Sequence, residues 1–349
     1  MMNKFFALWI TSMFLLASLA ALSCMGGKIF EVVEERYESS ATINNNEIFY
    51  HDDTQDPNGD EWHYLPSFPN YAPCGLPDFD QRQQEDWKNR RGHYTFCGPV
   101  ALANILWWFD SKYANPDGTP GDGNDTYFLV CDYHAPGTPN PGPYSDNHSF
   151  NNVNDLQTPW DKFGKNDELI EKIASYVNTN WYKIPIISLA GTDHFQMKWG
   201  IEKWFKDTGL QHRFDAKIIF RPSFPLIAER LQQNQGIILS IAFYNPYFKL
   251  FPFSFGHYVA VAGMNPNGAI ALSDPIRDMD SPLLNGVDYT LHNDASIVSH
   301  DRYDVNFTSP SSWLASWWLP DYPVWEGAVI FGAVIISEVD YVTSAECRP

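Results

Sequence analysis

A cysteine at the start of an apolar segment is the first residue in this sequence that could do chemistry. Cys97 is followed by Gly98-Pro99 and then by an apolar run from Val100 to Phe109. A proline in the first turn is typical of helix N-termini, so the pattern predicts a helix that begins at Cys97. The positive end of the helix dipole favours the thiolate, which is the nucleophilic form of cysteine. The pattern therefore favours a reactive cysteine over a small apolar core residue.

Two polar residues far downstream could complete a nucleophilic site. His257 opens the apolar run that ends at Gly263, and Asp274-Pro275 follows the next strand-like run. A histidine can hold a thiolate as an ion pair and then protonate the leaving group. A carboxylate on the neighbouring strand can accept the imidazole N–H and fix its tautomer. Each residue alone also fits an ordinary role, a strand start for His257 and a turn for Asp274, so the prediction depends on the combination.

This order of cysteine, histidine and aspartate resembles the papain-like cysteine peptidases, and in particular their C39-like, bacteriocin-processing branch. The matching stretches are Cys97-Gly-Pro-Val-Ala-Leu-Ala, Gly256-His257-Tyr-Val-Ala-Val-Ala-Gly263 and Asp274-Pro275. The resemblance implies an α+β, papain-like fold. In that fold the nucleophile lies at the N-terminus of a central helix, which packs on an antiparallel sheet that carries the histidine and the aspartate.

The resemblance also implies a role for each residue. Cys97 would attack a peptide or amide carbonyl, His257 would transfer the proton, and Asp274 would orient the imidazole. The expected function is that of an exported, stand-alone cysteine peptidase or amidase, a hydrolase that uses a Cys-His-Asp triad. Its partner would be a peptide or protein substrate, and it would need no cofactor and no metal.

An oxyanion hole is the fourth feature that the resemblance implies. The stretch Pro77-Asp-Phe-Asp-Gln81-Arg-Gln-Gln-Glu-Asp-Trp87 looks like the family's segment with a glutamine and a tryptophan before the cysteine. Gln81, with Gln83 and Gln84 as alternatives, would donate a side-chain N–H to the oxyanion together with the backbone N–H of Cys97. The sequence departs from the family's pattern here, because a longer stretch separates the glutamine from the cysteine.

Two other functions are compatible with the same residues. Transglutaminase-like enzymes use cysteine, histidine and aspartate in this order on a related fold, and they transfer the acyl group to an amine instead of water. A catalytically inactive, exported binding or surface module could keep the fold without the chemistry. Replacing Cys97 by alanine or serine separates the enzyme from the module, because hydrolysis would depend on the thiolate.

Hydrophobic periodicity predicts the elements that must position these residues. The helical segments are Cys97–Tyr113, Asp167–Val177, His194–Asp207 and Pro225–Gln233. The strand-like segments are Lys217–Arg221, Gly236–Phe243, His257–Gly263, Ala269–Ser273 and Ala328–Val339. Helices first and strands afterwards predict an α+β domain rather than alternating βαβ units.

The N-terminus predicts export. A short positive start is followed by an apolar run from Phe5 to Leu22 and by small residues, so residues 1–24 form a predicted signal peptide. A retained membrane-spanning helix and a lipid on Cys24 are the alternatives. We therefore expect a secreted or cell-surface protein that meets a membrane only through an uncleaved signal or a lipid anchor.

The rest of the chain divides into an extension and one domain. Residues 25–72 form a predicted N-terminal extension, and residues 73–345 form a predicted papain-like, C39-type domain. A stretch rich in proline, glycine and asparagine, at about 115–166, predicts a long surface insertion within that domain.

The charge balance excludes one class of partner. The chain has 349 residues, with Lys+Arg 23 against Asp+Glu 42 and a formal net charge of −19. Nucleic-acid binding requires a basic surface to neutralise phosphates, so this composition argues against it. Hydrophobic residues make up 44% of the chain, which is ordinary for a globular core.

The cysteines leave the disulfide pairing open. Removal of the signal peptide leaves Cys74, Cys97, Cys131 and Cys347, which allow three pairings in an oxidising compartment. The pairing of Cys74 with Cys131 is the first to test, because both flank loop-rich sequence.

No metal site is predicted. The chain has no CxxC pair and no HExxH helix, so structural zinc and a zincin metalloprotease are not expected. The acidic stretches Asp56–Asp60 and Asp117–Asp125 are better explained as solvated turns than as Ca²⁺ loops, because neither fits the EF-hand pattern.

Overall fold

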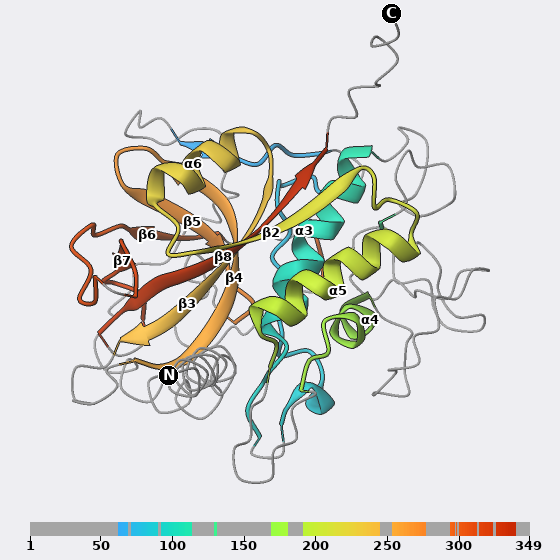
Figure 1. The fold of residues 1–349 in the computed structure, drawn as a ribbon, viewed down its shortest axis with the longest axis horizontal. Coiled ribbons are helices and arrows are strands. Elements are labelled where there is room, and N and C mark those ends of the chain that lie inside the picture. The colour runs from blue at the N-terminus through green and yellow to red at the C-terminus, as the bar shows by residue number, and fades with distance from the viewer. Residues whose placement is uncertain are drawn as a thin grey trace, which may run out of the picture.

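The computed structural model describes residues 62–68, 71–89, 92–113, 129–130, 169–180, 191–244, 253–276, 294–296, 298, 300–312, 314–323 and 326–339. Within these residues, four α-helices pack on an eight-stranded antiparallel sheet, as the α+β prediction expects (Figure 1). The helices are α3 (Cys97–Tyr113), α4 (Leu169–Tyr176), α5 (His194–Asp207) and α6 (Phe224–Gln232), with a 3-10 helix, η1 (Glu85–Trp87).

The strands form one continuous sheet. They are β1 (His63–Tyr64), β2 (Phe214–Phe220), β3 (Gly236–Tyr244), β4 (Phe253–Asn265), β5 (Ala269–Ser273), β6 (Asp301–Asp304), β7 (Trp318–Leu319) and β8 (Ala328–Glu338). Their order is β2-β8-β3-β4-β5-β6, with β1 on β4 and β7 on β8. The central strands β3 and β8 consist almost entirely of apolar residues, because both strands are buried along most of their length.

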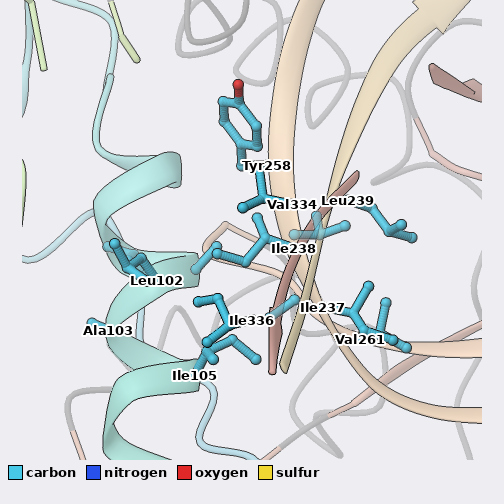
Figure 2. Packing of buried hydrophobic residues seen from close by; sticks show 14 of the residues in the cluster. Leu102, Ala103, Ile105, Ile237, Ile238, Leu239, Tyr258, Val261, Val334 and Ile336 are labelled. Atoms are coloured by element: carbon cyan, nitrogen blue, oxygen red, sulfur yellow. The ribbon is translucent and has the colours of Figure 1, made fainter. Parts of the chain in front are cut away.

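Helix α3 lies at the centre of the fold. Its residues are buried from Cys97 to Ser111, because it packs against β3, β4 and α4. Gly236 permits the close approach of helix and sheet, since a Cβ at this position would lie 2.3 Å from Cγ2 of Ile105. Figure 2 shows this packing, in which α3 faces the sheet residues Ile238, Val334 and Ile336.

Two other helices begin at caps that the sequence supplies. Asp193 caps α5 in a capping box: its side chain accepts from the backbone N–H of Gln196, and the side chain of Gln196 accepts from the backbone N–H of Asp193. Ser223 caps α6, and Pro225 occupies the first turn. Helix α5 packs on β2 and β8, whereas α6 packs on β1, β3 and β4.

The sequence patterns agree with most of these bounds. Helices α3 and α5 and strand β5 have the predicted limits, and the other predicted segments each coincide with an observed element. Strands β1, β6 and β7 were not predicted, because runs of two to four residues are too short for a period-2 pattern to be recognised.

The region assigned to an N-terminal extension contributes to the domain. Strand β1 pairs with β4, with Tyr64 opposite Gly263. Leu65 and Tyr71 belong to the main hydrophobic core. The described part of the extension is therefore packed on the same sheet, whereas the predicted signal peptide, residues 1–24, lies outside the described residues.

The predicted insertion is described at two residues only. Leu129 and Val130 are buried, and both backbone N–H groups donate to Oδ1 of Asp110 on α3, at 2.8 and 2.9 Å. This part of the segment is thus packed against the central helix and not on the surface. The rest of the stretch at 115–166 lies outside the described residues. Among the residues that are described, no helix is long and apolar enough to cross a membrane.

Candidate active site

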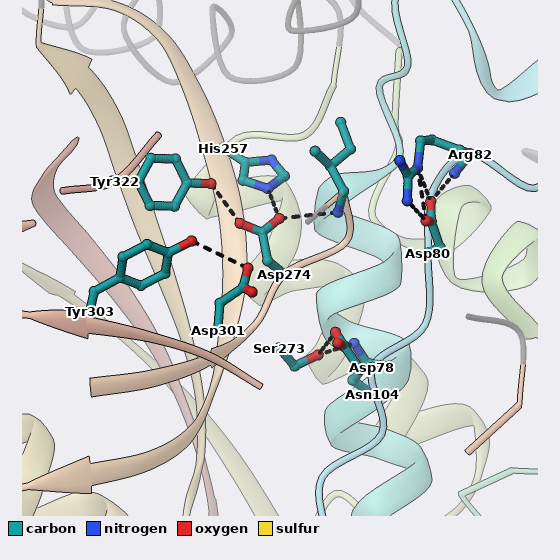
Figure 3. Close-up of polar contacts among 11 residues, drawn as sticks. Asp78, Asp80, Arg82, Asn104, His257, Ser273, Asp274, Asp301, Tyr303 and Tyr322 are labelled. Carbon is teal, nitrogen blue, oxygen red and sulfur yellow. Dashed lines mark hydrogen bonds and ion pairs between the residues drawn. The ribbon is translucent and has the colours of Figure 1, made fainter. Parts of the chain in front are cut away.

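A buried histidine–aspartate pair joins two neighbouring strands. Nε2 of His257, on β4, lies 2.7 Å from Oδ1 of Asp274, which directly follows β5 (Figure 3). The antiparallel register places Ser273 opposite Ala260, so the end of β5 lies beside the middle of β4, close to His257. His257 and Asp274 are each 3% exposed, so water does not compete for this hydrogen bond. The hydrogen bond expected from the sequence is present.

This hydrogen bond assigns the two ring nitrogens of His257. An ionised carboxylate only accepts hydrogen bonds, so Nε2 carries the proton and donates to Asp274. The other nitrogen, Nδ1, is then the atom that can accept a proton from a nucleophile. The arrangement has the chemistry of a general base that is oriented by a carboxylate.

Two further donors hold the carboxylate of Asp274. The backbone N–H of Ile276 donates to Oδ1 at 3.1 Å, and the hydroxyl of Tyr322 donates to Oδ2 at 2.6 Å. Tyr322 was missed in the sequence, because a tyrosine in a short irregular segment gives no signal of its contact. The ring of Phe243 packs against both residues, stacked on Tyr322 with centroids 5.8 Å apart and tilted against His257 with centroids 6.4 Å apart.

Gln81 lies next to the aspartate through its backbone. Its N–H donates to the carbonyl of Pro275 at 2.7 Å, and the residue is 2% exposed. Among the described residues its side chain has no hydrogen-bond partner, and Oε1 is fully buried. The atom without a partner is the acceptor oxygen of the amide, whereas an oxyanion would require the donor Nε2. The structure thus places Gln81 beside the residue that follows Asp274, and its role as an oxyanion donor stays a prediction.

The alternative glutamines are placed differently. Nε2 of Gln83 donates to the carbonyl of Asp80 at 2.9 Å, and Gln84 precedes η1 without capping it through its side chain. Asp80 is itself buried, and its carboxylate forms an ion pair with Arg82 in which the guanidinium donates several hydrogen bonds. Of the three glutamines, Gln81 is the one that bonds to Pro275, the residue that follows Asp274.

A polar network ties the glutamine segment, the central helix and the end of β5 together. Oδ1 of the buried Asn104, on α3, accepts from the N–H of Phe79 at 3.0 Å. Its Nδ2 donates to Oγ of Ser273 at 2.8 Å, and that hydroxyl also lies 2.8 Å from Oδ1 of Asp78. This network fixes α3 relative to the two segments that carry Gln81 and Asp274 (Figure 3).

Cys97 begins helix α3, as the sequence predicts, but it is not a thiol. The residue is fully buried and is disulfide-bonded. Its helix packs against β4, the strand of His257. A disulfide sulfur cannot act as the nucleophile of a thiol peptidase, so this is the oxidised form of the site.

The oxidation state also corrects the expected pairing. Cys74, the other cysteine that the structure describes, is not part of a disulfide, and its Sγ donates to the carbonyl of Ser296 at 3.4 Å. The pairing of Cys74 with Cys131 is therefore wrong. The partner of Cys97 lies outside the described residues.

A second buried histidine lies near the start of α3 but lacks an orienting carboxylate. The N-terminal turn of α5 touches Gly98, where an added Cβ would lie 3.0 Å from Cε of Met197. His194, in the same turn, packs on the rings of Tyr258 and Phe331, and its Nε2 has no hydrogen-bond partner. Burial lowers the pKa of His194 to about 4, so this ring is neutral at pH 7. His257 is thus the histidine with the geometry of a base.

The described residues contain no group of three or more histidine, cysteine, aspartate or glutamate side chains that could hold a metal ion. The acidic stretches Asp56–Asp60 and Asp117–Asp125 lie outside them. Comparison with known proteins adds no identification, since no family model matches this sequence and no curated protein matches it.

Proposed function

We propose that this protein is an exported cysteine peptidase or amidase of the papain-like, C39 type. The observation that carries the proposal is the buried hydrogen bond between His257 Nε2 and Asp274 Oδ1, which leaves Nδ1 available as a base. The position of Cys97 at the N-terminus of a helix packed on the same strand, and of Gln81 beside Pro275, supports it.

The proposed reaction has two halves, acylation of Cys97 and hydrolysis of the resulting thioester, and His257 transfers a proton in each. The Cys97 thiol passes its proton to Nδ1 of His257, and the thiolate attacks the carbonyl carbon of the scissile amide. The backbone N–H of Cys97 and the side chain of Gln81 donate to the oxyanion that forms. His257 then protonates the leaving nitrogen as the C–N bond breaks, and water, deprotonated by His257, hydrolyses the thioester.

The nucleophile must first be released from its disulfide. Two equivalents of a low-molecular-weight thiol, or one dithiol, would reduce it by exchange, with one electron pair transferred and two cysteine thiols formed. We propose that the oxidised chain is inactive and that hydrolysis requires this step. The protein would act outside the cytoplasm on peptides or proteins, with no nucleic-acid partner and no cofactor.

A second candidate is an exported binding module without catalysis. The disulfide at Cys97 favours it, because a module has no need for a thiol at this position and gains stability from the cross-link. The two functions differ in what happens after reduction.

Reduction followed by alkylation tests the proposal. The full-length protein is treated with dithiothreitol, labelled with iodoacetamide near pH 6 and mapped by mass spectrometry, with peptide hydrolysis followed in parallel. We expect preferential labelling of Cys97 and hydrolysis that appears only after reduction, is lost in Cys97→Ser and persists in Cys74→Ser. Hydrolysis that survives Cys97→Ser, or a reduced and folded protein that neither labels preferentially nor hydrolyses peptides, would exclude the enzyme and favour the module.

A further inference from the structure

Tyr322 donates a short hydrogen bond to the carboxylate that orients the histidine. It lies shortly after β7, and its hydroxyl donates to Oδ2 of Asp274 at 2.6 Å. The residue is 1% exposed, so the hydroxyl is not exchanging this contact for water. The same carboxylate accepts from His257 through the other oxygen, at 2.7 Å (Figure 3). One carboxylate thus links the tyrosine to the imidazole.

The surrounding rings hold the tyrosine in place. Phe243 stacks on it with an interplanar angle of 20°, and Tyr303 lies against it with ring centroids 5.2 Å apart. Phe243 also reaches the ring of His257. Packed rings on both sides limit rotation of the phenol, so the donor is pre-oriented toward Asp274.

Hydrogen-bond donors decide whether the buried carboxylate of Asp274 stays ionised. The side chain of Asp274 is fully buried, and its ionised form is favoured only while donors face it. Among the described residues, the titratable and charged groups on the surrounding elements are His257 on β4, Asp301 and Tyr303 on β6, and Asp78 and the Asp80–Arg82 ion pair on the segment before α3. Asp301 accepts from Tyr303 at 3.2 Å, so this second carboxylate has its own donor.

We propose that Tyr322 is a positioning residue of the triad, which keeps Asp274 ionised and directed at Nε2 of His257. The effect on catalysis rests on the proposed function, whereas the effect on the position of Asp274 rests only on the hydrogen bond. Loss of the hydroxyl would leave a buried carboxylate oxygen without this donor, and the carboxylate would take up a proton at higher pH.

The variant Tyr322→Phe tests the proposal, with Tyr303→Phe as a matched control. The control removes the hydroxyl of the neighbouring ring, which also donates to a buried carboxylate but not to Asp274. The first readout is NMR of the ¹⁵N-labelled imidazole of His257 in the reduced protein, which requires no activity. We expect the pH at which the hydrogen bond to Asp274 is lost to rise by about one unit in Tyr322→Phe and to stay unchanged in Tyr303→Phe.

The second readout is kinetic. We expect kcat/KM to fall about 10-fold in Tyr322→Phe and its acid limb to move up with the NMR transition. An NMR shift without any hydrolysis in the wild type would support the positioning role and contradict the proposed enzyme. Equal effects of both variants, or no change in the imidazole signals, would overturn the positioning role.

If Tyr322→Phe does not fold, a fluorinated tyrosine at the same position provides a second test. Incorporation of 3-fluorotyrosine at position 322 retains the ring and the hydroxyl but makes the phenol more acidic and a stronger donor. The NMR transition should then move to lower pH, and a transition that stays in place would count against the proposal.

Discussion

The backbone N–H of Gln81 donates to the carbonyl oxygen of Pro275 at 2.7 Å. This single bond joins the segment that precedes α3 to the residue that follows Asp274. It places Gln81, whose buried Oε1 has no hydrogen-bond partner among the described residues, beside the residue that follows the His257–Asp274 pair. The predictions below test whether this arrangement is a catalytic site and what holds it together.

Replacing Gln81 should affect the reaction more than the fold. In the reduced enzyme, Gln81→Ala is expected to lower kcat by about 10²-fold with a small change in KM, because an oxyanion donor acts mainly in the transition state. Gln83→Ala, in which the lost side-chain bond goes to the carbonyl of Asp80, is the control and should keep its kcat. If Gln83→Ala loses the activity and Gln81→Ala retains it, the donor has been assigned to the wrong glutamine.

Removing the orienting carboxylate should slow the reaction in a graded manner. Asp274→Ala is expected to reduce kcat by about 10³-fold, since His257 loses the acceptor that fixes its tautomer. Asp274→Asn should lie between this variant and the wild type, because an amide oxygen still accepts from Nε2. The exposed Asp304 provides a control, and its replacement by alanine should leave kcat unchanged. Steady-state kinetics on reduced protein measure all three, and equal rates in Asp274→Ala and the wild type would contradict the mechanism.

The network at Asn104 should contribute strongly to stability. Asn104→Ala leaves the N–H of Phe79 without its acceptor and removes the donor to the Ser273 hydroxyl, at a cost of about 3 kcal/mol in the free energy of unfolding. Urea denaturation measures the change. Asn267→Ala, at an exposed turn position, should change the same quantity by less than about 0.5 kcal/mol. A difference between the two variants below 1 kcal/mol, roughly the contribution of one ordinary hydrogen bond, would show that this network adds little.

Burial of His194 predicts that stability falls on acidification. Its pKa is lowered to about 4, below the ordinary value of 6.5, so the unfolded chain takes up a proton that the folded chain does not. Its contribution is constant above pH 6.5 and is lost as the pH falls from 6.5 toward 4, by about 2 kcal/mol at pH 5. In the wild type the free energy of unfolding should fall by about 2 kcal/mol between pH 7 and pH 5 through this residue. In His194→Leu this part of the fall should be absent. Replacement of the exposed His212 by glutamine should leave the difference as it is in the wild type, and the same slope in all three proteins would refute the assignment.

Local sequence determined the helices and the long strands. Cys97–Tyr113 and His194–Asp207 are helical because a proline in the first turn or a capping box starts them, and an apolar pattern continues them. The alternation of strand and turn residues after His257 was sufficient to predict the neighbouring strand, β5, which ends one residue before Asp274. The α+β class followed from the order of these elements.

Only the tertiary structure decided which polar groups meet. Tyr322 and Asp274 are 48 residues apart, and Asn104 and Ser273 are 169 apart. Such contacts depend on the strand register and on how α3 docks on the sheet, and a single polar residue carries no periodic signal of either. The same holds for the sulfur of Cys97. Its place at a helix N-terminus was encoded locally by Gly98-Pro99, whereas its pairing in a disulfide depends on which cysteine the folded chain brings to it.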